Sequence, residues 1–207
     1  MTAPARMRPA TVHDLPGVYR VCLQTGLSGG DASDAHTDPD LLGHVYAGPY
    51  VLFPDAVALV VVDAHGVSGY CVGVPDTLAF EQWCAREWWP PLRAQHPLDP
   101  RSVGATPSDS DAGLIRRFHH PVGTEPALAA SYPAHLHIDL LPRLQGLGWG
   151  RRLMCRMLEQ LAVAGAGGVH LGVAEANTGA HVFYERIDFA VVDRDDRSRT
   201  YARSLVT

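Results

Sequence analysis

A glycine-rich hexapeptide, Gln145-Gly146-Leu147-Gly148-Trp149-Gly150, follows an alternating apolar run and precedes a long amphipathic segment. This order predicts a strand, a tight turn and a helix. A helix N-terminus presents unpaired N–H groups and about half a positive charge, and glycines let an anion approach the backbone closely. Arg151 and Arg152 fall in the first turn, where the helix dipole disfavours cations. We therefore predict an anion-binding site here; the alternative is a tight turn beside two solvated arginines.

Other phosphate-binding motifs do not fit this segment. A dinucleotide fingerprint, Gly-x-Gly-x-x-Gly, would need glycine at Arg151 or Leu153. A Walker motif needs a lysine, and all 17 basic residues of the chain are arginine. The absence of lysine also excludes Schiff-base chemistry, including that of pyridoxal phosphate. A GC-rich genome would produce the same bias toward arginine without a functional cause.

Side chains that can move protons lie along the predicted strand before the glycines. Residues 134–141 alternate, with His137 and Asp139 on one face and apolar residues on the other. Asp139 is our first candidate for a general base and His137 the second, because both lie on the face of the strand that leads into this site. A carboxylate is a weak base unless burial raises its pKa, whereas histidine titrates near neutrality. Glu175, just after the next predicted strand, is a third candidate.

A metal site is an alternative use of the same strand. His135, His137 and Asp139 are the alternative metal ligands, because His-x-Asp with a distant histidine, His170 or His181, resembles the facial triad of an iron oxygenase. Such sites usually lie on β-sandwich folds, whereas here a long helix follows at once. We therefore expect no metal.

Composition limits the remaining classes. The 207 residues suit one domain over 1–207, and a net charge of −5 argues against dedicated nucleic-acid binding. The four cysteines form no CxxC pair, so neither a disulfide framework nor a zinc knuckle is predicted. The N-terminus lacks the apolar core of a signal peptide, and the longest apolar run, residues 57–62, is too short to span a membrane. We expect a soluble cytoplasmic protein.

The elements that must position these residues follow from periodicity and turn signals. Asp14 is expected to cap a first helix, Pro90-Pro91 to end a third one, and Asn177 to cap a helix that continues through Ile187. Residues 95–133 are proline-rich and aperiodic, which predicts an irregular insertion or lid. The other expected elements are an extended segment near residue 7, a short helix from residue 39, a hairpin of 57–62 with 67–74, and strands over 169–174, 189–193 and 200–206.

The hexapeptide resembles the acyl-coenzyme-A motif of the GNAT superfamily of N-acetyltransferases, Gln/Arg-x-x-Gly-x-Gly/Ala. The order of predicted elements is similar over nearly the whole chain, as is a later signature of Asn177, Phe183-Tyr184 and Phe189, although Asp188 stands where that signature often has glycine. The resemblance implies an α/β (α+β) fold. Its central sheet would be mixed, mostly antiparallel and twisted, with about seven strands flanked by helices and a long insertion before the motif strand.

The resemblance also implies acetyl-CoA as cosubstrate and an amine as acceptor. Backbone amides of residues 146–150 would hold the pyrophosphate, and the backbone of Leu140 and Leu141 would pair with the pantetheine arm. Tyr184 occupies the family's acid position, and a phenol with a pKa near 10 is a proton donor at neutral pH. Asn177 would be a helix cap first and a cofactor contact second. The implied cofactor-binding set is Leu140, Leu141, Gln145, Gly146, Leu147, Gly148, Trp149, Gly150, Arg151 and Asn177.

A narrower resemblance leaves a second function open. The insertion, Trp88-Trp89-Pro90-Pro91-Leu92-Arg93 and residues 132–139 resemble bacterial relatives of the acetyltransferase-like domain of O-GlcNAcase. This implies, as an alternative, a pseudo-acetyltransferase or interaction module without turnover. The acceptor stays open between a small molecule and a protein lysine. The segment that carries Asp31, Asp34, Asp38 and Asp40 often lines the acceptor groove in this superfamily, which hints at a cationic acceptor, with a solvated loop as the alternative. We expect a monomer or homodimer.

Overall fold

A seven-stranded sheet organises the computed structural model, which describes residues 4–99 and 110–205. Neighbouring strands are antiparallel except β4 and β5, which are parallel. The expected mixed, mostly antiparallel sheet is therefore confirmed. In the spatial order β1-β2-β3-β4-β5-β7-β6, the strands are β1 (Arg6–Pro9), β2 (Val57–Asp63), β3 (Gly66–Val74), β4 (Ala134–Leu140), β5 (Gly168–Ala174), β7 (Ser198–Ser204) and β6 (Ala190–Arg194).

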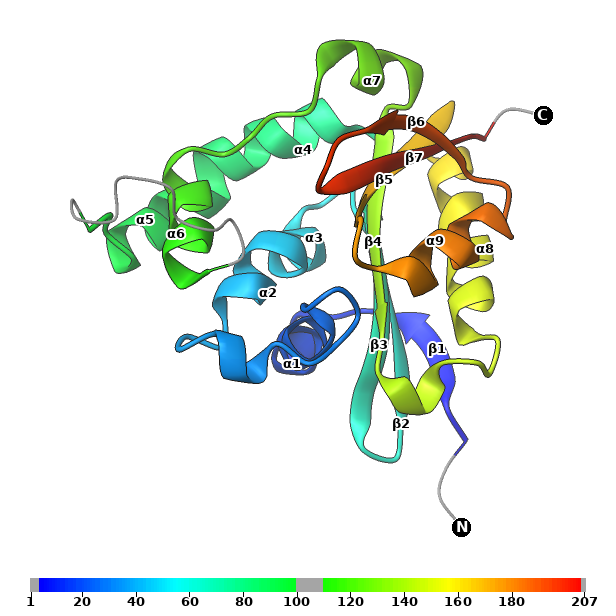
Figure 1. Ribbon diagram of the computed structural model, residues 1–207, viewed down its shortest axis with the longest axis horizontal. Helices are drawn as coiled ribbons and strands as arrows, with labels where there is room; N and C mark the ends of the chain where they lie inside the picture. The colour runs from blue at the N-terminus through cyan, green and yellow to red at the C-terminus, as the bar shows by residue number, and fades with distance from the viewer. Residues whose placement is uncertain (1–3, 100–109, 206–207) are drawn as a thin grey trace.

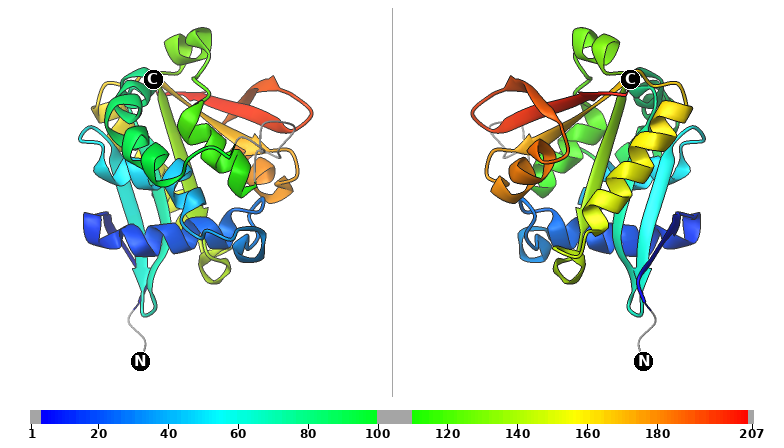
Figure 2. Two further views of the ribbon diagram at one scale, coloured as in Figure 1. Left: turned by 90° about the vertical axis from the view of Figure 1, so that its left-hand side faces the viewer. Right: turned by 90° about the vertical axis from the view of Figure 1, so that its right-hand side faces the viewer.

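Helices cover both faces of the sheet (Figures 1 and 2). On one face α8 packs across β2, β3 and β4, and on the other α1 packs on β3 and β4. Two apolar cores result, one on each face. The helices are α1 (Leu15–Thr25), α2 (Leu41–Tyr46), α3 (Gly48–Leu52), α4 (Thr77–Trp83), α5 (Trp89–Gln95), α6 (Asp111–His119), α7 (Pro126–Ser131), α8 (Trp149–Val163) and α9 (Thr178–Glu185). Among the described residues, no helix combines the length and the apolar composition that a membrane span requires.

The parallel pair at the centre of the sheet is short. β4 has seven residues, but only Ala134 and His135 pair with β5. β4 stays paired with β3 on its other side as far as Leu140. Figure 1 shows β5, β7 and β6 turning away from the direction of β4. The sheet therefore splits beyond His135, where no strand in the described part of the chain pairs with the β5 side of β4.

The predicted hairpin and the helix caps were tested by the structure. β2 and β3 form the hairpin, and Gly66 has a φ of 94°, a left-handed conformation that favours glycine. Asn177 caps α9, because its Oδ1 accepts a hydrogen bond from the Ala180 N–H. Asp14 stands at the N-cap position of α1, but the expectation that its side chain caps the helix is wrong, because it makes no capping hydrogen bond. Its carboxylate instead accepts two 2.7 Å hydrogen bonds from the Arg8 guanidinium, which ties β1 to the start of α1.

Two further expectations about the helices are wrong. Pro90 and Pro91 lie in the first turn of α5 rather than ending a helix, because a π-helical segment, Cys84–Trp88, separates α4 from α5. Proline suits a first turn, where an N–H would have no intrahelical partner. Residues 95–133 are not irregular throughout, since they contain α6 and α7. Residues 100–109 of that insertion lie outside the described part of the chain.

Candidate active site

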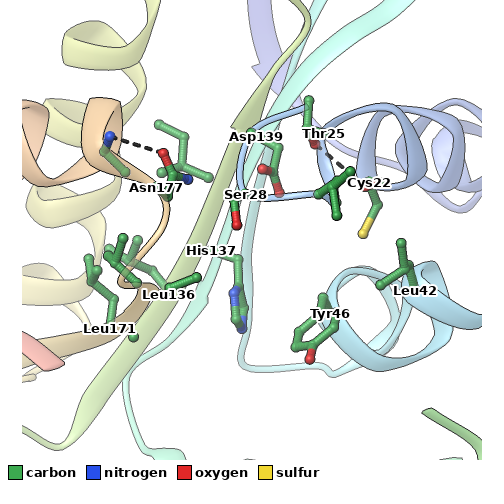
Figure 3. A pocket seen from close by; sticks show the side chains of 18 of the residues that line it. Cys22, Thr25, Ser28, Leu42, Tyr46, Leu136, His137, Asp139, Leu171 and Asn177 are labelled. Atoms are coloured by element: carbon green, nitrogen blue, oxygen red, sulfur yellow. Dashed lines mark hydrogen bonds between the residues drawn. The ribbon is translucent and has the colours of Figure 1, made fainter. Parts of the chain in front are cut away.

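A continuous cavity occupies the split between β4 and β5. One part, of about 670 Å³, lies between the end of β4, the glycine-rich turn and the start of α9. The next part, of about 790 Å³, lies between β4 and β5 on one side and α1 and α2 on the other (Figure 3). Asp139, Asn177 and Tyr184 line both parts, so they mark the junction.

The glycine-rich turn leaves open space at the mouth of the cavity. Gly146 and Gly148 have φ values of 70° and 80°, and a Cβ built on either one would meet no atom within 4 Å. A Cβ on Gly150 would lie 3.3 Å from the ring of Phe183. Gly146 and Gly148 are thus suited to their left-handed backbone conformation. Gly150 instead allows α9 to pack closely against the start of α8. All three line the cavity.

The first turn of α8 carries the two arginines that the sequence singled out. Arg151 lines the cavity, and none of the described residues forms an ion pair with it. Arg152 instead places its guanidinium carbon 4.9 Å from the centre of the Trp149 ring, a cation–π contact. Arg151 is therefore the cation available to an anion at this helix N-terminus.

The expected cofactor-binding set divides into lining and supporting residues. The lining members are Leu140, Gln145, Gly146, Gly148, Gly150, Arg151 and Asn177. Gln145 Nε2 donates a 2.8 Å hydrogen bond to the Leu140 carbonyl, which holds the turn against the end of β4. Leu141 is buried and its N–H donates to the Ser68 carbonyl. Leu147 and Trp149 are also absent from the cavity wall. Contacts of Leu141, Leu147 and Trp149 with a ligand remain a prediction, and their positions outside the cavity wall do not favour it.

Asp139, on β4, is an acidic residue of the cavity wall. It lies at the junction, and its Oδ2 accepts a 2.5 Å hydrogen bond from the hydroxyl of Tyr70, its cross-strand partner on β3. Burial raises the pKa of Asp139, although the hydrogen bond from Tyr70 opposes that shift. The carboxylate is therefore a stronger base than an exposed aspartate.

His137 lies one step along the same face, beyond the junction. Its ring points into the cavity and contacts the rings of Tyr46 and Tyr50, with centroids 5.7 Å and 5.5 Å apart (Figure 3). Among the described residues, none forms a hydrogen bond with either ring nitrogen. Burial, and then the nearby His170, lowers the pKa of His137 to about 4. His137 is therefore neutral at pH 7 and a weak base.

This depressed pKa should make stability depend on pH. The unfolded chain, with a histidine pKa near 6.5, takes up a proton at His137 before the folded protein does, so stability is lost as pH falls from about 6.5 toward 4. We expect the wild type to lose about 1–2 kcal/mol more than His137→Gln between pH 7 and pH 5. Urea unfolding at both values checks this, with exposed His120→Gln as control. Equal losses in wild type and His137→Gln would contradict the burial of a neutral ring.

Tyr184 reaches the junction from α9. It is buried, and its ring packs near Phe189 and Tyr201, with centroids 5.6 Å and 5.7 Å away. Burial, followed by the charges of Cys71 and Asp139, raises the pKa of Tyr184. None of the described residues forms a hydrogen bond with its hydroxyl, although the residue lines the cavity. A neutral phenol is therefore available to a ligand.

Glu175 is held away from this chemistry. Its carboxylate accepts hydrogen bonds from Arg199 at 2.8 Å and 2.6 Å and one from Arg194 at 2.9 Å. The hydrogen bonds from Arg199 are the main reason that its pKa falls to about 2. Glu175 does not line the cavity, and a base role would require breaking these ion pairs. Glu175 is therefore not placed to act as the base.

The alternative metal site does not form from the described residues. No group of three or more His, Cys, Asp or Glu side chains is placed among them to hold a metal ion. His170 donates through Nδ1 to the Tyr132 carbonyl, and His181 contacts the Tyr201 hydroxyl at 3.1 Å. Neither one therefore completes a triad with His137 and Asp139.

Several lining residues were not predicted from the sequence. Ser28 and Gly29, both with positive φ, form the cavity wall opposite Asn177. The Ser28-Gly29-Gly30 run was an available signal of a tight loop. Tyr46 and Arg117 reach the cavity from α2 and α6, which no local pattern could indicate.

Comparison with known proteins agrees with this geometry. A profile described as "Acetyltransferase (GNAT) family" matches residues 114–189. The chain is similar to the solved structure of SsHAT, with 34% identity, a TM-score of 0.86 and coverage of 99% of this chain and 100% of that chain. The protein yncA from Salmonella typhimurium, solved with its cofactor acetyl-CoA, shares the fold, with 15% identity, a TM-score of 0.56 and coverage of 99% and 96%.

A more distant similarity involves a much longer protein. Protein O-GlcNAcase of Rattus norvegicus is 21% identical over 182 residues, which covers 87% of this chain and 19% of that protein. The mouse protein matches equally. The chain therefore spans about a fifth of the length of these curated relatives.

Proposed function

The chain belongs to the GNAT acetyltransferase family, and from this membership we propose that it transfers an acetyl group from acetyl-CoA directly to a primary amine. The observation that carries the proposal is the split between β4 and β5. It leaves a strand edge, from Leu136 to Leu140, that leads to a glycine-rich helix N-terminus, with Asp139 and Tyr184 in the wall of the same cavity.

The residues along this edge fit coenzyme A. Gly146 and Gly148 border open space, and the unpaired N–H groups at the start of α8, with Arg151, suit a pyrophosphate. Among the described residues, no strand pairs with β4 beyond His135 on the β5 side, so its backbone groups can bond the amides of the pantetheine arm as an added strand would. The Leu140 carbonyl already accepts a hydrogen bond from Gln145. When bound, acetyl-CoA supplies an acetyl thioester as the electrophile.

Asp139 serves as the general base in this proposal. An ammonium acceptor must lose a proton before its nitrogen can attack a carbonyl carbon. Asp139 lies at the junction of the two cavity parts, and burial raises its pKa. The hydroxyl of Tyr70 fixes the orientation of the carboxylate. His137, with its lowered pKa, is a contact on the acceptor side rather than the base.

Tyr184 serves the leaving group. The departing thiolate needs a proton or a strong hydrogen bond. A buried neutral phenol that bonds to none of the described residues can donate one. Asp139 and Tyr184 line the same junction from the two sides of the split. Asp139 lies on β4, and Tyr184 lies on α9, the helix that follows β5. Two different residues therefore serve the two proton transfers. Asp139 takes a proton from the ammonium acceptor, and Tyr184 donates one to the departing thiolate.

Two measurements on the intact chain test the proposal. Calorimetry with acetyl-CoA should give one saturable site, and release of free thiol should depend on an added amine. Because the chain has no lysine, acetyl-lysine found in such an assay must come from the acceptor. Binding without thiol release on any amine would favour the coenzyme-A-binding module without turnover, and no binding would remove the proposal.

A further inference from the structure

The cavity continues past His137 into a third part on the side away from the glycine-rich turn. This part, of about 350 Å³, is lined by α4, α6 and the segment 121–124. It shares Tyr46, His137 and Gly172 with the central part. If coenzyme A occupies the β4 edge, as proposed above, this third part is where the acceptor must enter.

An arginine that forms an ion pair with none of the described residues lies in the wall of this part. Arg117, on α6, is half-buried, and its guanidinium carbon lies 5.7 Å from the centre of the Tyr46 ring. Among the described residues, none forms an ion pair or a hydrogen bond with its side chain. A partly desolvated guanidinium gains strongly from an anion, because five N–H donors are left to be satisfied.

The acidic residues of the wall do not supply that anion. Glu81 Oε1 accepts hydrogen bonds from the N–H and hydroxyl of Thr124, at 2.9 Å and 2.8 Å. Asp139 accepts the hydrogen bond from Tyr70. Arg197 is a second arginine of the wall, on the side of the central part. The third and central parts of the cavity are thus lined by one arginine each, and the carboxylates of Glu81 and Asp139 in their walls already accept hydrogen bonds.

We infer that the acceptor is an amine that also carries an anionic group, a carboxylate or a phosphate, and that Arg117 binds this group. A planar guanidinium matches both oxyanions through paired hydrogen bonds. The inference rests on the proposed function, because that function assigns this part of the cavity to the amine acceptor. It replaces the expected cationic acceptor, because none of Asp31, Asp34, Asp38 and Asp40 lines the cavity.

Matched amines test this inference. Kinetics with β-alanine against β-alaninamide, and O-phosphoethanolamine against ethanolamine, separate a carboxylate from a phosphate requirement. We expect kcat/KM of the wild type to be at least about tenfold higher for the anionic member of one pair, a difference of about 1.4 kcal/mol. Arg117→Gln should abolish this preference by raising KM for the anionic amine. Arg117→Lys should keep part of it, and Arg116→Gln, the adjacent position outside the cavity wall, should keep it all.

Failure of the inference is separable from failure of the proposed function. Equal kcat/KM for the two members of both pairs would overturn the inference, and so would a preference for the anionic amine that persists in Arg117→Gln. In either case, turnover of the neutral amines would still support the proposed acetyltransferase function. If no amine is acetylated, the inference can still be tested by measuring the affinity of the same four amines for the protein–coenzyme A complex by calorimetry. Tighter binding of an anionic amine that is lost in Arg117→Gln supports the inference; equal binding within the pairs overturns it. Thermal unfolding of each variant confirms that the fold is kept.

Discussion

Replacement of Tyr184 by phenylalanine should lower kcat about 100-fold and leave acetyl-CoA affinity unchanged. The hydroxyl lines the junction of the cavity and has no hydrogen-bond partner among the described residues, so its loss removes a donor from the reaction and nothing from the fold. The ring keeps its packing against Phe189 and Tyr201. Steady-state kinetics with a saturating amine, together with calorimetry, measure the two quantities separately.

Tyr201→Phe is the matched control. Tyr201 is fully buried beside Tyr184, but its hydroxyl contacts His181 and Glu185 and does not line the cavity. We expect this variant to lose about 1 kcal/mol of stability with kcat nearly unchanged. A Tyr184→Phe enzyme with wild-type kcat would show that the departing thiolate obtains its proton elsewhere.

Replacement of Gly148 by leucine should weaken acetyl-CoA binding at least about tenfold, or 1.4 kcal/mol. The residue has a φ of 80° at the N-terminus of α8, and its Cβ would project into open space that the pyrophosphate is proposed to fill. The left-handed conformation also costs a non-glycine residue about 1–2 kcal/mol of stability. Calorimetry gives the first effect and urea unfolding the second.

Gly165→Leu separates these two effects. Gly165 follows the other end of α8, has a φ of 91°, and a Cβ there would also meet nothing within 4 Å. Both variants should therefore lose similar stability, but only Gly148→Leu should lose affinity. Equal affinities in the two variants would contradict our placement of the pyrophosphate at the glycine-rich turn.

The local elements around the site were predictable because their signals are local. Glycines at 146, 148 and 150 indicated a turn at a helix N-terminus, and alternation over residues 134–141 placed His137 and Asp139 on one face of a strand. Both predictions are confirmed, since each depends only on backbone conformation or on the two-residue period of a strand.

The contacts that decide the role of each residue were not predictable, because they join segments distant in sequence. Glu175 was a plausible base until Arg194 and Arg199, on the final hairpin, were seen to hold its carboxylate. The hydrogen bond from Tyr70 to Asp139 depends on the register of β3 against β4. Arg117 reaches the cavity only because α6 packs beside α2.

Amide hydrogen exchange with and without acetyl-CoA tests the central claim most directly, because it reports where the ligand binds. We predict slower exchange on binding at two places, the β4 edge from residue 136 to 140 and the turn from 146 to 151, where backbone N–H groups are proposed to gain partners. The β1–β2 pair, which is remote from the cavity, should exchange unchanged. Saturating acetyl-CoA with no added protection on β4 or in the turn would contradict the account.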